Sequence, residues 1–374
     1  MHEMEIFPVR RAIERLRAGL FDPVAVDRLT MEEETVIQNF SQGLNALEKG
    51  QSGHLCLCGS YGQGKSHNLT YLQRLALSQG YAVSLLQLDA REVPFHQFSV
   101  VYQALMKNLS LPTGESFAAR WKKCSLEVLE DAPHRFRMIL QAMLAKNKLL
   151  PKRGGAKNGL KTKDFDHWLE QALAGRDLPT FHLKQILKTR EIEGCREQPL
   201  TVRGNAPYVQ MIQSLGKLLH AMGCKGLVLF FDEAESIAQG RLGARVKSYE
   251  ILGRFFQHSG FVYPVFAFTE TFFDKVRSEE YGGEASPFPQ NYFDAWKSLQ
   301  IIRLQEFSLA RWEALQDRLI ALYAEAYQID IAAKLPEIKQ QMGGLLEKLK
   351  TQETRFKLKA LINQLDIICT GTTS

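Results

Sequence analysis

The stretch HLCLCGSYGQGKSHNLTYLQRLALSQG, residues 54–80, decides the fold of this chain. It begins with a short apolar run bounded by glycine, which is the pattern of a buried strand. A Gly-rich turn follows, and the residues after the turn have the apolar spacing of a helix. Within the turn, residues 59–66 match GxxxxGK[ST], and a strand before and a helix after are the context that this phosphate-binding loop requires.

The residue types in this loop suit the phosphates of a nucleotide. Its glycines let backbone N–H groups turn towards phosphate oxygens, and the following helix presents its N-terminus to the anion. Lys65 would reach the β- and γ-phosphates, and the Ser66 hydroxyl would coordinate Mg²⁺. We therefore expect a nucleotide and Mg²⁺ beside Gly59, Gly62, Gln63, Gly64, Lys65 and Ser66.

An acidic motif further along the chain predicts a reaction. In GLVLFFDEAE, residues 226–235, an apolar strand ends in Asp232 and Glu233. Asp232 would hold Mg²⁺ through water and Glu233 would polarise the attacking water, a pair that favours hydrolysis. A strand-to-helix turn rich in acids is the alternative, which the preceding phosphate loop weakens. Because no [NT]KxD motif follows a later strand, we expect ATP rather than GTP.

Three more apolar runs, at 82–89, 263–270 and 298–307, complete the expected strands. Strands that alternate with helices predict an α/β fold with a mostly parallel, five-stranded sheet covered on both faces. We expect three parts: N-terminal helices packing on the core at 1–50, an ATPase core at 51–307 with a helical insertion at about 94–222, and a helical lid at 308–374.

The composition is that of an ordinary soluble globular protein. Of the 374 residues, 45% are hydrophobic and 24% charged, enough to bury a large core. The net charge of +6 is compatible with a polyanionic partner, but a plain solvated surface explains it more simply. Six cysteines without a CxxC pair suit a reducing cytosol, and neither a secretory signal nor a membrane span is indicated.

Several stretches resemble the AAA+/origin-recognition-like P-loop ATPases and, more narrowly, the ATP-binding proteins of bacterial BREX phage-defence systems. The similar segments are RRAIERLRAGL, the phosphate-loop segment with its histidine, GCKGLVLFFDEAESI with the Arg-containing stretch after it, and TRFKLKALINQLDII. The resemblance implies an AAA+-like core with a helical lid. It also implies a role in anti-phage defence, as an ATP-dependent assembly or switch factor acting near DNA with other defence proteins.

The resemblance implies roles for single residues. Thr269, after the fourth strand, would sense the γ-phosphate, and Arg355 would contact it from the lid. A strand-end capping threonine and a solvated helix arginine are the alternatives. His67 would border the nucleotide, or else pack or cap at the start of its helix. A homo-oligomer would need an arginine reaching a neighbouring subunit's ATP, and the candidates are Arg277, ranked first, and Arg241, Arg245 and Arg254. Surface positions or nucleic-acid contacts are the alternative for most of these four.

A run of basic residues without acids lies between 146 and 163. Such a segment suits salt-dependent contacts to the phosphates of double-stranded DNA, whereas a solvated insertion loop explains the same pattern. It holds no aromatic residue, so base stacking is not indicated. The candidates for nucleic-acid contacts are Lys152, Arg153, Lys157, Lys161 and Lys163.

Three other functions stay open from the sequence. The first is an ATP-dependent switch or scaffold that binds protein partners without touching nucleic acid. The second is an NTPase outside defence, and the third is an inactive nucleotide-binding scaffold. The intact Lys65, Asp232 and Glu233 argue against the third.

Overall fold

The computed structural model describes residues 2–20, 22–31, 33–124, 130–148, 161–194, 198–257, 260–280 and 299–370. The chain divides into two compact units. The first unit comprises Met1–Asn39, Leu57–Leu72 and Ile301–Ser374, and the second unit comprises Phe40–Cys56 and Gln73–Gln300.

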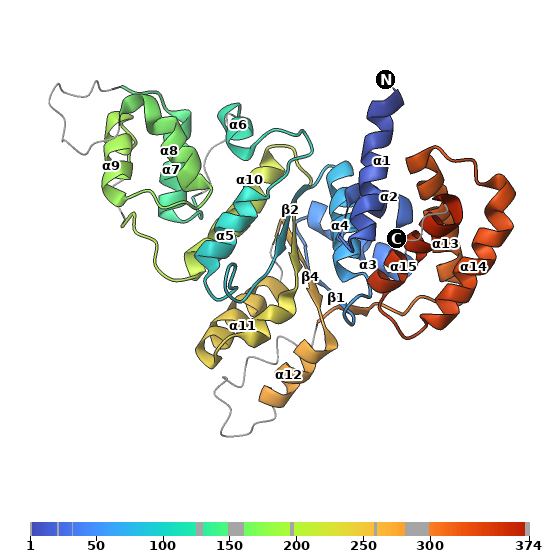
Figure 1. The fold of residues 1–374 in the computed structure, drawn as a ribbon. Coiled ribbons are helices and arrows are strands. Elements are labelled where there is room, and N and C mark those ends of the chain that lie inside the picture. Colours follow the sequence, from blue (N-terminus) through green and yellow to red (C-terminus); the bar gives the residue numbers. More distant parts are fainter. Residues whose placement is uncertain are drawn as a thin grey trace. The chain divides into compact units, whose positions relative to one another are not determined.

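Five strands form one parallel sheet in the order β2-β3-β4-β1-β5 (Figure 1). The bounds are β1 (Leu55–Cys58), β2 (Ala82–Gln87), β3 (Leu227–Asp232), β4 (Val262–Phe268) and β5 (Ile301–Arg303). The five-stranded parallel sheet predicted from the sequence is therefore confirmed. The last strand is much shorter than its predicted run, because only its middle residues join the ladder.

The described helices fall in both units. The first unit contains α1 (His2–Arg17), α2 (Pro23–Leu29), α13 (Leu309–Tyr327), α14 (Leu335–Lys348) and α15 (Thr354–Thr370). The second unit contains α5 (Phe98–Lys107), α6 (Phe117–Lys122), α7 (His134–Leu144), α8 (Phe165–Leu173), α9 (Thr180–Thr189), α10 (Ala206–Ala221), α11 (Leu242–Phe256) and α12 (Glu270–Glu280). Residues of both units occur in α3 (Glu34–Glu48) and α4 (Lys65–Ser78).

In the second unit, β3 is buried along its whole length because helices cover both of its faces. Successive strand residues point to opposite faces. Phe230 packs near Phe40 of α3, whereas Phe231 lies 5.9 Å from the ring of Phe255 in α11. On the α3 side the helix comes very close to β4: a Cβ placed on Gly43 would lie 2.2 Å from the ring of Tyr263, so only glycine fits there.

The segment between β2 and β3 carries its own packed cluster of α7, α8 and α9, drawn in green in Figure 1. Arg190, at the end of α9, is 4% exposed and joins the three helices. Its guanidinium donates to the carbonyl of Ala142 at 2.6 Å and to the Asp166 carboxylate at 3.0 Å. Burial of an arginine is tolerated where such partners satisfy its donors.

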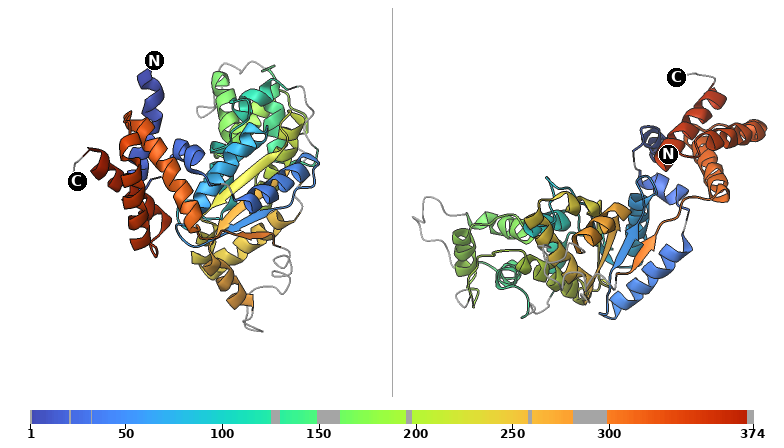
Figure 2. Two further views of the ribbon diagram at one scale, coloured as in Figure 1. Left: turned by 90° about the vertical axis from the view of Figure 1, so that its right-hand side faces the viewer. Right: turned by 90° about the horizontal axis from the view of Figure 1, so that it is seen from below.

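In the first unit, α1 and α2 share one apolar core with α13, α14 and α15 (Figure 2). The sequence led us to expect residues 1–50 on the ATPase core, and the structure joins α1 and α2 to the C-terminal helices. An amphipathic pattern shows which face of a helix is buried but does not name its partner. The domain limits expected from the sequence stay a prediction.

A half-buried polar contact supports this arrangement. Arg17 of α1 donates to both carboxylate oxygens of Asp366 in α15, at 2.8 and 3.1 Å. The Tyr323 hydroxyl of α13 donates to the same carboxylate at 2.7 Å. A bidentate arginine–carboxylate pair sets the direction of both side chains as well as their distance.

The short helix α2 begins with a proline, Pro23. The Asp22 carboxylate accepts from the Val24 N–H at 2.9 Å and caps the helix. Proline suits the first helical position because its missing N–H has no partner there in any case. In the described part of the chain, no helix is long and apolar enough to cross a membrane.

Candidate functional site

The phosphate loop joins β1 to α4 in the first unit. Gly62 and Gly64 have φ angles of +76° and +82°, in the left-handed region that favours glycine. A Cβ on Gly62 would also lie 3.1 Å from the Cβ of Glu353. The loop thus needs glycine at 62 for both backbone and space, although the motif GxxxxGK[ST] leaves this position open.

Lys65 is the first residue of α4 and is 8% exposed. Its ammonium donates to the carbonyls of Gly59 at 2.9 Å and Ser60 at 3.1 Å, so it lies over its own loop. The Gln63 side chain accepts from the Ser60 N–H at 2.6 Å and closes the loop from the other side. Ser66 is exposed at the start of α4. The cation and the hydroxyl named from the sequence therefore both belong to the loop-to-helix junction.

His67 contacts α2 of the same unit. The Thr30 hydroxyl donates to the carbonyl of Val26, so its oxygen accepts from the Nε2–H of His67 at 2.6 Å. Burial lowers the pKa of His67 to about 4. The imidazole is therefore neutral at pH 7 and adds no positive charge to the phosphate loop. Its position suggests that it links α4 to α2.

This buried histidine predicts acid sensitivity. The unfolded chain takes up a proton at its usual pKa of 6.5, whereas the folded chain does so near 4. Stability is therefore complete above pH 6.5 and falls as the pH drops towards 4, by up to ~3 kcal/mol from this group. In urea unfolding, we expect the wild type to lose more stability between pH 7 and pH 4 than His67→Gln. Equal losses in the two proteins would contradict this prediction.

A cavity of about 700 Å³ lies beside the phosphate loop within the first unit. Residues 60–63 of the loop form one wall, the segment after β5 a second, and the α14–α15 connection a third. Tyr61, Phe307 and Trp312 line it with aromatic rings, and Lys357 brings an ammonium group. Most of the other lining residues are polar or charged, including Lys350 and the carboxylates of Glu306, Glu347 and Glu353.

The lid arginine expected from the sequence lies elsewhere in this unit. Arg355 is exposed, and its stem runs beside Gly19, where a Cβ would lie 3.5 Å from Cδ of Arg355. Lys357, two residues later, lines the cavity. Its ammonium donates to the carbonyl of Lys350 at 2.9 Å and lies 5.1 Å from the Trp312 ring. Sequence reasoning missed Lys357, because the direction of a side chain on a short helical turn has no signature in the sequence.

The acidic motif lies in the second unit, at the carboxyl end of β3. Asp232 is the last residue of that strand and is 8% exposed. Its carboxylate accepts from the Glu233 N–H at 2.9 Å. Glu233 has a φ of +52°, which is uncommon for a residue with a side chain. A local conformation of this kind is often associated with function.

Thr269 follows β4, the strand next to β3 in the same unit. Because parallel neighbouring strands end at one edge of the sheet, Thr269 and Asp232 belong to the same edge. Thr269 is 5% exposed, and its hydroxyl shares a hydrogen bond of 2.7 Å with that of Thr271. This polar residue is thus buried at the sheet edge where the acidic motif lies.

The four arginine candidates for a neighbouring subunit's nucleotide differ in their surroundings. Arg245 is bound within its own unit, to the Glu279 carboxylate at 2.8 Å and the carbonyl of Gly240 at 2.7 Å. Arg277 pairs with Asp274 one turn earlier on α12, at 2.6 Å. Arg241 immediately precedes α11 and is exposed, and Arg254 lines a second cavity. The choice among them stays a prediction.

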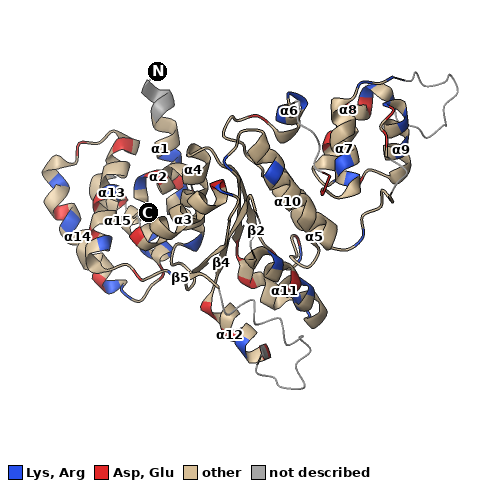
Figure 3. Ribbon diagram, turned by 180° about the vertical axis from the view of Figure 1, so that it is seen from behind, with Lys and Arg blue, Asp and Glu red and all other residues tan. Residues whose placement is uncertain are grey.

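The basic run lies largely outside the described residues, which omit Lys152, Arg153 and Lys157. Lys161 and Lys163 are described and exposed, just before α8. In Figure 3, α7 and α9 carry basic residues, whereas α8, which packs with them, carries only acidic ones. The described part of this region is therefore not a continuous basic surface.

The donors named for Mg²⁺ fit that ion chemically. Ser66 offers a hydroxyl oxygen and Asp232 a carboxylate, and Mg²⁺ prefers oxygen ligands. Within the described ranges, no three His, Cys, Asp or Glu side chains are grouped to hold a metal ion. Mg²⁺ in nucleotide sites keeps several waters and takes phosphate oxygens, so one or two protein ligands suffice.

Comparison with known proteins gives one family. The model of the BREX system ATP-binding protein BrxC/D matches residues 8–120 and 201–372, which include the phosphate loop, the acidic motif and α15. No curated protein matches the chain. Among solved structures, the Walker-type ATPase Paby2304 of Pyrococcus abyssi is similar over 92% of this chain and 69% of its own, with 12% identity and a TM-score of 0.44.

Proposed function

Because this chain belongs to the family of BREX system ATP-binding proteins, BrxC/D, and shares its ATP-binding role in anti-phage defence, we propose that it hydrolyses ATP and couples the reaction to a switch or assembly step near DNA. The observation that carries the proposal is the phosphate loop. Gly62 and Gly64 have left-handed backbone conformations that favour glycine, and Lys65 already lies over the loop at the start of α4. A cytoplasmic location is part of the same proposal.

In this proposal each residue has a chemical role. Gly59, Gly62, Gln63 and Gly64 present backbone N–H groups to the phosphates, and Lys65 neutralises charge on the β- and γ-phosphates. Ser66 and Asp232 hold Mg²⁺, which when bound would offset charge on the transferred phosphoryl group. Glu233 orients and polarises the attacking water, and Thr269 positions that water or the γ-phosphate.

We further propose that Lys357, rather than Arg355, is the lid cation for ATP. Lys357 lines the cavity that also contains the loop residues 60–63, whereas Arg355 is exposed beside Gly19. Loss of a charge-assisted contact to phosphate costs about 1.5–3 kcal/mol, which is roughly 10- to 150-fold in affinity.

This proposal is tested by comparing Lys357→Ala with Arg355→Ala. We expect Lys357→Ala to weaken binding of a fluorescent ATP analogue by at least about tenfold, and Arg355→Ala to change it little. Both changes remove one positive charge from the first turn of α15. A difference in ATP affinity between the two variants therefore reflects the position of the lost charge and not the net charge of the protein. The reverse order of effects would restore Arg355 as the lid residue.

The test of the proposed function is steady-state ATP hydrolysis, with and without double-stranded DNA. Turnover that rises with DNA supports the proposed switch or assembly factor acting near DNA. If the rate of ATP hydrolysis is the same with and without DNA, the result favours the second candidate, an ATP switch that binds other defence proteins only. ATP binding without turnover in either condition, or in the presence of the other defence proteins, would overturn the proposal of hydrolysis.

A homo-oligomer also stays a proposal. If an arginine from a neighbouring subunit completes the site, specific activity should rise with protein concentration in the range where subunits associate. Sedimentation at the same concentrations, with and without ATP, measures that association directly.

A further inference from the structure

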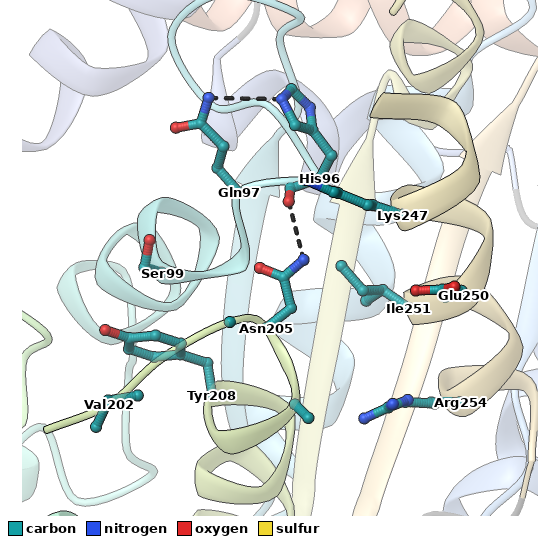
Figure 4. A pocket seen from close by; sticks show the side chains of 12 residues that line it. His96, Gln97, Ser99, Val202, Asn205, Tyr208, Lys247, Glu250, Ile251 and Arg254 are labelled. Carbon is teal, nitrogen blue, oxygen red and sulfur yellow. Dashed lines mark hydrogen bonds between the residues drawn. The ribbon is translucent and has the colours of Figure 1, made fainter. Parts of the chain in front are cut away.

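A second cavity, of about 550 Å³, lies wholly in the second unit and is not part of the phosphate loop. Three segments surround it: the residues before and at the start of α5, the segment leading into α10, and one face of α11 (Figure 4). We call it the α11 hollow. Because Gln97, Lys247 and Arg254 are all exposed at its rim, it is open to solvent.

One asparagine side chain connects two walls of the α11 hollow, the segment leading into α10 and the residues before and at the start of α5. The Asn205 side chain accepts from the Phe98 N–H at 3.1 Å and donates to the carbonyl of His96 at 3.0 Å. Asn205 immediately precedes α10, yet its side chain makes no capping hydrogen bond to that helix. The first turn of α10 therefore faces the hollow without a side-chain cap, and its positive end is available to an anion.

The opposite wall carries two cations on one helical face. Lys247, Ile251 and Arg254 of α11 occur at positions i, i+4 and i+7, so they share one side of the helix. Figure 4 shows Lys247 and Arg254 extending towards the α5 and α10 segments, from either side of Ile251. Within the described ranges, neither Lys247 nor Arg254 forms an ion pair, although Glu250 lies between them on the same helix.

The chemistry of the α11 hollow favours phosphate groups in a row. Seven residues of helix advance about 10 Å, so the two cations are too far apart to share one small anion. Successive charges along one DNA strand are about 3.4 Å apart along the axis, so this span covers roughly three phosphates. Tyr208, Gln97 and Ser99 add neutral hydrogen-bonding groups, which often position a nucleic-acid backbone. Burial, and then the charge of Lys247, lowers the pKa of His96 below its usual value, which disfavours the charged ring.

We propose that the α11 hollow binds the phosphate backbone of double-stranded DNA, with Lys247 and Arg254 as the contacting cations. This site deepens the proposed DNA association and rests on it. It differs from the basic run at 146–163, which the sequence suggested. For Arg254 the sequence left open a contact to a neighbouring subunit's ATP or to nucleic acid, and in this proposal it contacts nucleic acid. Since these contacts read the backbone, they add affinity without sequence preference.

The experiment measures binding of a fluorescent DNA duplex to the full chain by anisotropy, over a range of salt concentrations. At about 0.1 M salt each lost phosphate contact weakens binding by roughly tenfold. We expect Lys247→Gln/Arg254→Gln to weaken binding about 100-fold and to lower the salt slope by about 2. Lys184→Gln/Lys188→Gln removes the same charge from the exposed side of α9 and serves as the matched control.

A third variant tests the sign of the effect. Glu250→Gln removes the acidic group that repels phosphate in the α11 hollow, so it should strengthen DNA binding by a few-fold. Damage to the fold cannot produce such a gain. Thermal melting of all variants checks that the exposed substitutions leave the fold intact.

The outcomes separate this inference from the proposed function. If the wild type binds DNA and the double variant binds as the control does, the α11 hollow is not the contact and this inference alone fails. If the wild type binds no duplex even at low salt, the proposed DNA association itself fails, and this inference with it. A loss in the double variant and a gain in Glu250→Gln would establish the site.

Discussion

Lys65→Ala is expected to abolish measurable ATP hydrolysis and to weaken ATP binding about 100- to 1,000-fold. Its ammonium is the only side-chain cation within the phosphate loop, residues 59–66, and it lies over the carbonyls of Gly59 and Ser60. Removing one donor that stabilises a developing negative charge costs an enzyme about 2.7–4 kcal/mol in the catalysed step, which is roughly 10²- to 10³-fold in rate. Binding is measured with a fluorescent ATP analogue, and hydrolysis by release of phosphate.

The control for Lys65→Ala is thermal stability. ATP at about 100 times its Kd should stabilise the folded wild type by about 2.7 kcal/mol, and this gain should vanish in the variant. Melting without ATP shows whether loss of the two loop hydrogen bonds has damaged the fold. Lys359→Ala, on the exposed surface of α15, removes the same charge outside the loop. A variant of Lys65 that is stabilised by ATP as the wild type is would refute the role assigned to this residue.

Glu233→Gln is expected to slow hydrolysis by about 10²- to 10⁴-fold while ATP binding is kept. The amide has nearly the shape of the carboxylate, so the left-handed backbone at 233 is retained. It cannot accept a proton from the attacking water, which is the role proposed for Glu233. The variant should therefore trap the ATP-bound state, which pre-steady-state filtration of labelled nucleotide would detect.

The matched control is Glu235→Gln, two residues later in the same short turn at Ala234–Gln239. It makes the same change in charge without touching the residue at the end of β3. We expect it to hydrolyse ATP close to the wild-type rate. Equal loss of activity in both variants would mean that net charge at this turn, and not a base at 233, governs the reaction.

The local parts of the site could be predicted from the sequence because each depends on residues close in the chain. Residues 59–66 impose a backbone that only glycines at 62 and 64 allow, and the structure has those φ angles. Asp232 ends an apolar strand, and that strand proved to be buried throughout. Both patterns are short enough for backbone conformation and burial to be determined locally.

Other features depended on side-chain direction, which no local pattern specifies. The sequence pointed to Arg355, but the first turn of α15 directs that residue to Gly19 and brings Lys357 to the cavity. It placed His67 at the nucleotide, but the ring bonds to Thr30 of the segment after α2. The basic run at 146–163 lies largely outside the described residues and stays a prediction. No local pattern showed that α11 presents Lys247 together with Arg254 to one hollow.

The sequence by itself determined the strand, loop and helix of the phosphate site, the acidic strand end and the class of the sheet, because these follow from periodicity and from the conformations open to glycine. Only the tertiary structure decided that α1 and α2 share a core with α13 to α15. It also decided that Lys357, and not Arg355, lines the cavity beside the phosphate loop, and which cations face α10. The physical reason is that the hydrophobic effect is non-directional. A sequence pattern shows that one face of a helix or strand must be buried, but the segment that buries it is determined by how distant parts of the chain pack.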